Sequence, residues 1–160
     1  MPINVTAIPG LPDHVNDVRI RTANFINTEI LPRESQLFVR RKGAAVTEEE
    51  LAHAKVLREE IKTKVKAAGL WAPHLPAEYG GMGLDFLAHA YMNEILAYAL
   101  GAASLFGVVA PNSGNQKILL KYGTEEQKRK WLLPLVEGVM ESGYSMTEPE
   151  NAGSDPRSIK

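Results

Sequence analysis

The stretch 144–155 holds the residue types of this chain that are best suited to bind a ligand. It reads Tyr-Ser-Met-Thr-Glu-Pro-Glu-Asn-Ala-Gly-Ser-Asp. Proline and glycine in this stretch disfavour a regular helix. Its backbone amides and side-chain hydroxyls are therefore expected to stay available for other hydrogen bonds. Such a loop can present N–H groups and a hydroxyl to the heteroatoms of a flat polar ring. The residues alone leave two interpretations open, an ordinary turn and a ligand site.

Other kinds of catalytic or metal chemistry find little support in the sequence. The chain has no cysteine, which excludes a thiolate nucleophile, an iron–sulfur cluster, a cysteine zinc site and a disulfide framework. It has neither a Gly-x-Ser-x-Gly nucleophile motif nor a phosphate-binding Gly-x-x-x-x-Gly-Lys motif. Glu94 lies in an otherwise apolar segment, where a buried or helix-edge ion pair is its ordinary explanation. The histidines lack metal-ligand spacing and are expected at the surface or as satisfied core residues: His14, His53, His74 and His89.

Composition and charge indicate an ordinary globular domain. The 160 residues include 18 Lys and Arg against 19 Asp and Glu, and 44% are hydrophobic. A net charge of −1 argues against nucleic acid or an anionic membrane as the main partner, because both select basic patches. The longest weakly polar stretch, 95–111, is shorter than the ~20 residues of a membrane-spanning helix. Residues 1–12 resemble neither a secretory signal nor a mitochondrial presequence, so the expected compartment is the cytoplasm.

The first 69 residues read as two helices and a connector. Apolar residues three to five apart predict a helix from about Asp13 to Ile30, which Pro32 ends. Residues 33–45 are expected to form a polar connector, with a solvated basic cluster at 40–42.

The clearest element is the second helix. It is expected to begin at a capping box formed by Thr47 and Glu50 and to end at Gly69. Glu60 and Lys64 add an ion pair one turn apart. One face carries an apolar stripe: Leu51, Ala54, Leu57, Ile61, Val65 and Ala68.

Further helices are expected after a loop over 70–83. Asp85 caps a helix that reaches about residue 100. The small residues of 101–114 indicate either close helix packing or space for a ligand. The residues of the capped helix that are expected to face inward are Leu87, Tyr91, Ile95 and Tyr98.

The last third begins with a helix from about 115 to 122. A second capping box at Thr124 opens a short helix that Pro134 bends or ends. A short strand is expected over 144–147, and loop thereafter. The predicted fold class is all-α.

Three motifs resemble the acyl-CoA dehydrogenase family. Residues 75–83 resemble its Pro-x-Glu-Tyr-Gly-Gly-x-Gly signature, and residues 122–128 resemble the Tyr-Gly-Thr-Glu-Glu-Gln-Lys start of one of its helices. Residues 146–149 followed by 153–155 resemble its Thr-Glu-Pro and Gly-Ser-Asp flavin loop. Three motifs in this order and spacing are far more specific than any one of them, and the match covers about residues 70–155.

The flavin loop departs from the pattern of most members by one residue. Three residues, 150–152, separate Thr-Glu-Pro from Gly-Ser-Asp, where most of the family has two. Together with residues 110–115, this spacing is similar to the subgroup related to dehydrogenases of longer or branched acyl chains.

The resemblance implies an N-terminal helical domain over residues 1–140 and the start of a middle β domain over 141–160. It implies FAD as the cofactor, with Thr147 bonding to the pyrimidine side of the flavin. Ser154 would touch both the cofactor region and the acyl-CoA substrate, whereas Gly80–Gly83 would mainly shape a turn, with no catalytic role implied. The residues implied to bind the cofactor are Tyr144, Ser145, Met146, Thr147, Gly153 and Ser154.

In this family the flavin abstracts a β-hydride while a glutamate removes the α-proton, which gives a trans-2-enoyl-CoA. That glutamate belongs to a part of the family fold beyond Lys160, so no catalytic residue and no metal ligand is expected here. We expect the chain to be a fragment that is inactive alone. The resemblance implies a parent enzyme that passes electrons to an electron-transfer flavoprotein and forms a homodimer or homotetramer.

Two alternatives stay open at this point. A flavin monooxygenase or nitroalkane oxidase can share the fold, although the Thr-Glu-Pro run favours the dehydrogenase. A non-catalytic helical adaptor is the other alternative, but a pure scaffold has no need of a loop with Thr147 and Ser154.

Overall fold

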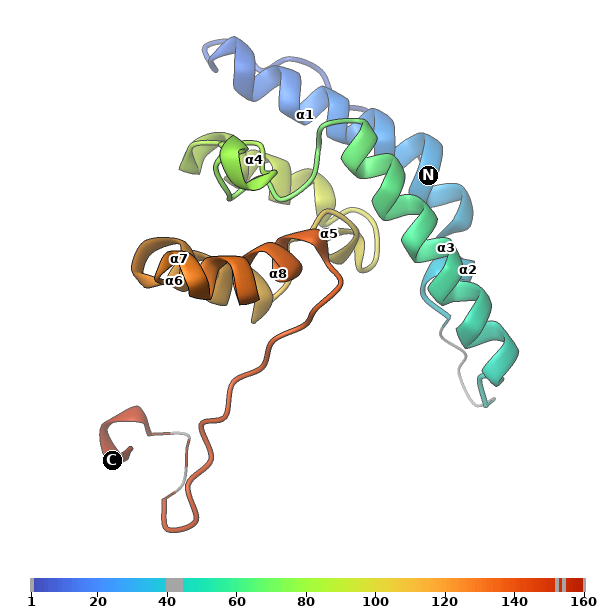
Figure 1. Cartoon of the computed structure of the whole chain (residues 1–160). Helices are drawn as coiled ribbons and strands as arrows, with labels where there is room; N and C mark the ends of the chain where they lie inside the picture. The colour runs from blue at the N-terminus through green and yellow to red at the C-terminus, as the bar shows by residue number, and fades with distance from the viewer. Residues whose placement is uncertain (1, 40–44, 152, 154, 160) are drawn as a thin grey trace. The chain divides into compact units, whose positions relative to one another are not determined.

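The chain folds into helices joined by turns and loops (Figure 1). The computed structural model describes residues 2–39, 45–151, 153 and 155–159. Within these ranges no strand is formed, and the single β-type bridge pairs Glu148 with Asn151. The predicted all-α class is confirmed, whereas the strand expected over 144–147 is not formed.

Two compact units make up the chain, residues 1–109 and 110–160. Both the helical domain predicted over 1–140 and the β-domain start predicted over 141–160 stay predictions. The basic cluster at 40–42 lies outside the described residues.

In its described residues, the first unit contains one long, interrupted helix followed by three further α-helices. Its elements in chain order are α1 (Asp13–Phe25), the π-helical η1 (Ile26–Ile30), the 3₁₀-helical η2 (Leu31–Arg33), α2 (Glu34–Leu37), α3 (Glu48–Ala67), the 3₁₀-helical η3 (Ala77–Tyr79), α4 (Phe86–Leu96) and α5 (Ala102–Leu105).

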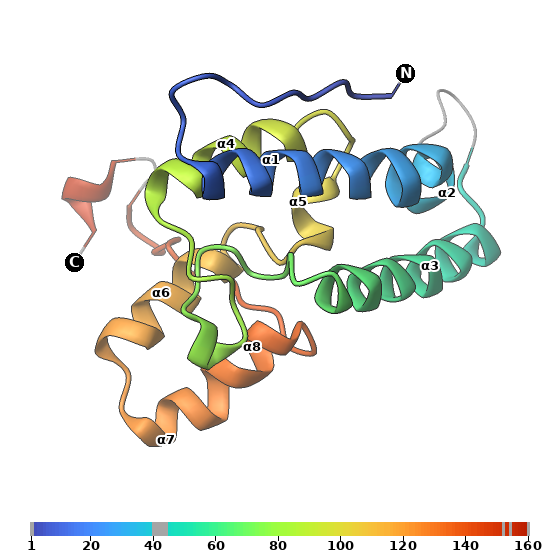
Figure 2. The same cartoon turned by 90° about the horizontal axis from the view of Figure 1, so that it is seen from above.

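The predicted first helix is formed by α1 and η1 together, and its apolar face is buried. α1 lies beside α4 (Figure 2). At its C-terminal end, the ring of Phe25 meets the ring of Phe106 edge-on, with centroids 5.5 Å apart. The apolar residues whose spacing predicts this helix are all 2% exposed or less: Val15, Val18, Ala23, Ile26 and Ile30.

Each of the two π-helical turns of the chain's described part ends two residues before a proline. η1 ends before Pro32, and η4 of the second unit (Lys128–Leu132) ends before Pro134. Proline removes the N–H that would bond to the carbonyl four residues earlier, and its ring collides with that carbonyl. The wider π turn accommodates this defect, so the chain stays helical through the proline.

The prediction that Pro32 ends the first helix is therefore wrong. The chain continues through η2 into α2, inside the stretch predicted to be a polar connector. Leu37 in α2 is fully buried, and tertiary packing of this side chain explains why a four-residue helix forms there.

α3 begins and ends as predicted. The Thr47 hydroxyl accepts a hydrogen bond from the Glu50 amide at 3.2 Å, and the Glu50 carboxylate accepts one from the Thr47 amide at 3.0 Å. Gly69 adopts a left-handed conformation with φ of +65° just after the helix. Of the predicted stripe, Leu51 is 52% exposed, while the buried members are Ala54, Leu57, Ile61 and Val65.

A four-membered ion network joins η1 and η2 to α3. Lys64 Nζ lies 2.8 Å from Glu29 Oε2 and 3.0 Å from Glu60 Oε1, so the predicted Glu60–Lys64 pair is confirmed. Arg33 pairs with the same two carboxylates. The hydrogen bond from Lys64 is the main cause that holds the pKa values of Glu29 and Glu60 below their ordinary value.

The N-terminal segment 2–12 lies along α1 and η1, where two asparagines hold it (Figure 2). The Ile3 amide donates to Asn27 Oδ1 at 2.7 Å, and Asn27 Nδ2 donates back to the Ile3 carbonyl at 2.8 Å. Asn16 makes the same pair of bonds with Ile8, at 2.8 and 3.1 Å. The two amide side chains thus bond to the segment's backbone as a neighbouring strand would.

The loop between α3 and α4 is closed by its own backbone. The Leu75 carbonyl accepts from the Gly83 amide at 2.8 Å, and the Ala72 carbonyl accepts from the Leu75 amide at 3.0 Å. A Cβ on Gly81 would lie 2.2 Å from the Leu75 oxygen and 2.6 Å from the Ala72 oxygen. Gly80 has a φ of +80°. The glycines of this motif therefore shape a tight turn, as predicted.

α4 begins at its predicted cap but presents another face to the core. The Ala88 amide donates to Asp85 Oδ1 at 2.8 Å. Leu87 and Tyr98 were expected to face inward and are 44% and 61% exposed. Glu94 is exposed, and among the described residues it forms neither a buried nor a helix-edge ion pair. The helix ends at Leu96, and its buried residues are Ala88, Met92, Ile95 and Leu96.

The second unit contains α6 (Asn112–Tyr122), α7 (Glu125–Gln127), η4, α8 (Leu133–Glu137) and the 3₁₀-helical η5 (Pro156–Ser158). The predicted capping box forms, because the Thr124 hydroxyl accepts from the Gln127 amide at 3.2 Å and its amide donates to Gln127 Oε1 at 2.9 Å. Gln116 is buried and donates Nε2 to the Leu135 carbonyl at 2.9 Å, which ties α6 to α8. None of the described helices has the length and apolar character needed to cross a membrane.

Candidate functional site

After α8 the chain leaves the helices as an extended, largely exposed segment (Figure 1). The helix stops at Gly138, which has a left-handed φ of +78°. Residues 139–143 then lead into the stretch that the sequence predicts as a ligand loop. We call residues 144–155 the flavin loop.

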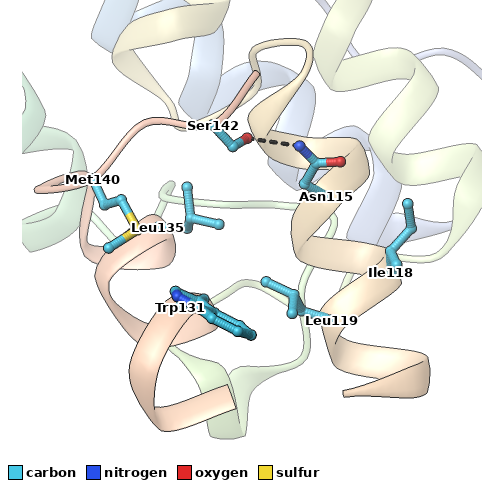
Figure 3. Close-up of a pocket in the computed structure, with 7 residues that line it drawn as sticks. All are labelled: Asn115, Ile118, Leu119, Trp131, Leu135, Met140 and Ser142. Atoms are coloured by element: carbon cyan, nitrogen blue, oxygen red, sulfur yellow. Dashed lines mark hydrogen bonds between the residues drawn. The ribbon is translucent and has the colours of Figure 1, made fainter. Parts of the chain in front are cut away.

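Ser142, two residues before this loop, is held on α6 by Asn112 and Asn115, and we call these three residues the Asn–Ser clamp. The Ser142 amide and hydroxyl both donate to Asn112 Oδ1, at 2.8 and 2.9 Å. Asn115 Nδ2 donates to the Ser142 hydroxyl at 2.9 Å, as Figure 3 shows. The clamp fixes the point at which the loop departs from α6.

Tyr144 follows two residues later and reaches back to α6. A Cβ on Gly114 would lie 3.0 Å from the Tyr144 hydroxyl, so the phenol tip rests against this glycine. Tyr144 is nevertheless 63% exposed. The loop thus meets α6 at the first turn of the helix, through the clamp and through Gly114.

The residues predicted to contact the flavin remain open to a ligand. Tyr144, Ser145, Met146 and Thr147 are all exposed. Within the part of the chain that the structure describes, the amides of Ser145, Met146 and Thr147 have no hydrogen-bond partner, and neither do the Ser145 and Thr147 hydroxyls. This run of available donors and acceptors suits the heteroatoms of a flat polar ring.

The far side of the flavin loop folds back on its start. Glu148 and Asn151 form an antiparallel bridge, and Asn151 Nδ2 donates to Glu148 Oε2 at 2.8 Å. A Cβ on Gly153 would lie 3.5 Å from the Met146 carbonyl oxygen. The structure therefore brings Gly153 beside Met146, whereas Ser154 lies outside the described residues.

Asp155, the last residue of the loop, pairs with Arg157 just beyond it. Its two carboxylate oxygens accept hydrogen bonds from the Arg157 guanidinium, each at 3.0 Å. These bonds are the main cause that lowers the pKa of Asp155 below its ordinary value. The carboxylate also accepts from the Arg157 amide at 3.1 Å, which caps η5. Its role in the structure is thus to close the turn.

A hollow of about 330 Å³ lies beside the clamp, between α6 and η4 (Figure 3). Its surface is almost wholly apolar, with Asn115 and Ser142 as the polar members. Trp131 and Ile118 are 38% and 54% exposed there. No local sequence pattern reveals this hollow, because its walls come from residues 115–119 and 131–142, which are separate in the sequence. The lining residues are Asn115, Ile118, Leu119, Trp131, Leu135, Met140 and Ser142.

A second hollow, of about 410 Å³, lies in the first unit among residues 93–103 and Val108. Here the sequence left close packing and ligand space as alternatives. Close packing is confirmed at Gly101, where a Cβ would lie 2.4 Å from the Phe38 ring. Space for a ligand, the other alternative, stays a prediction for which this hollow offers room.

No cluster of three or more potential metal ligands occurs among the residues described in the structure. His14 Nε2 lies 2.9 Å from Asp85 Oδ2, and the rings of His74 and His89 stack with centroids 5.9 Å apart. These histidines thus contact neighbouring side chains.

Comparison with known proteins identifies the class of this helical domain. The profile described as "Acyl-CoA dehydrogenase, N-terminal domain" matches residues 14–139. The chain therefore belongs to the acyl-CoA dehydrogenase family, and it has the fold of the family's N-terminal helical domain.

Named relatives agree with this assignment. The chain is 37% identical over 156 residues to acyl-CoA dehydrogenase family member 10 of Mus musculus, covering 94% of this chain and 14% of that protein. It is 37% identical over 148 residues to "Probable acyl-CoA dehydrogenase FadE2" of Mycobacterium tuberculosis, covering 90% of this chain and 34% of that protein.

A solved structure shares the fold. A Mycobacterium abscessus protein assigned to the acyl-CoA dehydrogenases superposes with a TM-score of 0.79 at 35% identity, covering 91% of this chain and 37% of that chain. The chain thus covers between 14% and 37% of the length of these relatives.

Proposed function

We propose that this chain is the N-terminal domain of an FAD-dependent acyl-CoA dehydrogenase that oxidises acyl-CoA to trans-2-enoyl-CoA. The observation that carries the proposal is the exposed run 144–147, whose amides and hydroxyls are available to a ligand in the described part of the chain. The names of the relatives support the enzyme class. The one-residue longer spacing in the flavin loop favours longer or branched acyl chains.

The residues present fit a flavin through the chemistry of their donors. When bound, FAD supplies the hydride acceptor. On this chain, the Thr147 amide and hydroxyl would bond to the pyrimidine side of the ring, while Tyr144, Ser145 and Met146 line it. Gly153 lacks a side chain, which lets the returning loop lie close to Met146. Ser154 would add a contact to both the cofactor region and the acyl-CoA.

The proposal assigns this chain no part in the proton abstraction itself. No described carboxylate lies in the run 144–147, and the base that removes the α-proton would come from the rest of the enzyme. The isolated chain should therefore form no enoyl-CoA. The whole enzyme would pass its electrons to an electron-transfer flavoprotein, act as a homodimer or homotetramer, and work in the cytoplasm in fatty acid metabolism.

Amide chemical shifts of the ¹⁵N-labelled chain during an FAD titration test the flavin contact. Because the chain supplies only part of a cofactor site, we expect weak binding, with shifts concentrated at residues 144–147. Adenosine diphosphate is the matched control, since it lacks the flavin ring and should leave these amides unchanged. Absence of loop shifts at millimolar FAD, or equal shifts with adenosine diphosphate, would contradict the proposal.

Activity of the chain alone provides a second test. Incubation of the purified chain with FAD, an acyl-CoA and an artificial electron acceptor should yield no enoyl-CoA. Formation of enoyl-CoA above the protein-free rate would show that the catalytic base lies within these residues.

A further inference from the structure

We infer that Asn112 is a positioning residue for the flavin loop. This inference rests on the proposed function, because it concerns the segment that would contact FAD. Asn112 lies on α6 and contacts none of the residues 144–147 through a hydrogen bond. It acts through Ser142, two residues before Tyr144.

The geometry of the clamp favours one arrangement of Ser142. Both donors of this residue, the amide and the hydroxyl, bond to the same oxygen, Asn112 Oδ1. The hydroxyl oxygen then accepts from Asn115 Nδ2. Because the Ser142 hydroxyl donates one hydrogen bond and accepts another, the rotation of its O–H bond is restricted. The Asn–Ser clamp thus restrains both the position and the orientation of Ser142.

The clamp provides all the hydrogen bonds that tie segment 141–147 to a helix in the described part of the chain. Before this segment, the Met140 amide bonds to the Pro134 carbonyl at 3.3 Å. After it, Glu148 and Asn151 bond to each other within the loop. Removing Asn112 Oδ1 deletes two of the three anchoring bonds.

The position of Tyr144 reports whether the clamp holds. Its hydroxyl rests against Gly114, two residues after Asn112 on α6. An extended chain advances about 3.3 Å per residue, so a shift of Ser142 by one position carries Tyr144 off this glycine. The amides that follow Tyr144 move with it, and with them the donors offered to the flavin.

Three variants of the 160-residue chain test the inference. Asn112→Ala removes the acceptor oxygen, Asn112→Asp keeps it, and Ser142→Ala leaves α6 unchanged while deleting the hydroxyl. The readouts are the nuclear Overhauser contact between the Tyr144 ring and the Gly114 α-protons, hydrogen exchange at the Ser142 amide, and the apparent affinity for FAD.

In Asn112→Ala we expect loss of the Tyr144–Gly114 contact, at least tenfold faster exchange at Ser142 and at least tenfold weaker FAD binding. Asn112→Asp keeps the acceptor oxygen and should therefore retain the contact, the Ser142 protection and the FAD affinity. Chemical shifts of residues 116–122 report whether α6 stays folded. If Asn112→Ala unfolds α6, Ser142→Ala decides in its place, since loss of the Tyr144–Gly114 contact there supports the inference.

Retention of the contact, of Ser142 protection and of FAD affinity in Asn112→Ala overturns the inference. Failure of the proposed function looks different. In that case FAD shifts no loop amide in the unmodified chain, while the Tyr144–Gly114 contact is still present in it and lost in Asn112→Ala.

Discussion

Replacement of Gly81 by alanine tests the packing of the loop between α3 and α4. The added carbon would lie 2.2 Å from the Leu75 carbonyl oxygen and 2.6 Å from the Ala72 oxygen. Both atoms belong to the backbone, so no side chain can rotate away. Both also accept hydrogen bonds, from Gly83 at 2.8 Å and from Leu75 at 3.0 Å. The loop must therefore open to admit one methyl group.

The cost follows from two contributions. Overpacking in a rigid site costs about 1–3 kcal/mol. Loss or distortion of two loop hydrogen bonds adds about 1 kcal/mol each. The free energy of unfolding of Gly81→Ala should therefore fall by roughly 3–5 kcal/mol, which lowers Tm by at least roughly 6 °C for a chain of this size.

Thermal and urea denaturation followed by circular dichroism at 222 nm measure this loss. Gly143→Ala is the matched control, since a Cβ there meets no heavy atom within 4 Å. The control should stay within about 0.5 kcal/mol of the unmodified chain. A Gly81→Ala variant as stable as the Gly143→Ala variant would refute the assignment of a steric requirement to this glycine.

Three further predictions concern the N-terminal segment, the cap of α3 and the ion network between η1, η2 and α3. Asn27→Ala removes both bonds to Ile3 and should speed hydrogen exchange at the Ile3 amide at least tenfold, with little change at the centre of α3. Thr47→Ala removes the cap of α3 and should lower the free energy of unfolding by about 1 kcal/mol in urea denaturation, whereas a cost near zero would contradict the capping box. The pKa of Glu29 is lowered mainly by Lys64, so the stability it contributes is present above its unfolded pKa near 4.5 and is lost as pH falls through the lower folded value. Lys64→Met should therefore destabilise the chain at pH 7 and flatten the acid limb of its stability profile, and an unchanged limb would exclude this origin.

The caps of the helices were predictable because each depends on local chemistry. At Thr47 and Thr124, a hydroxyl and a Glu or Gln three residues later satisfy each other's backbone donors. Asp85 caps α4 in the same local way. None of these interactions needs a partner distant in the sequence, so spacing alone locates them.

The inward face of α4 could not be predicted in the same way. This helix is apolar on nearly all sides, so periodicity does not distinguish a stripe through Leu87 and Tyr98 from one through Ala88 and Met92. In the folded chain, packing against α1 buries the stripe through Ala88 and Met92. Likewise, the sequence shows that Pro32 lacks an amide, but only the surrounding contacts show that Leu37 is buried beyond it.

For the candidate site, the residue types of the flavin loop and, through three motifs in order, the family follow from the linear sequence. Residue types and motifs can be recognised without a structure, because they depend only on which residues occur and how far apart they lie in the sequence. The bond between Ser142 and Asn112 and the contact of Tyr144 with Gly114 each join residues 30 apart in sequence, so they follow from the folded structure. A contact across 30 residues depends on how α6, η4 and α8 pack between its ends, and that packing is a sum of many weak apolar contacts with no signature at either residue.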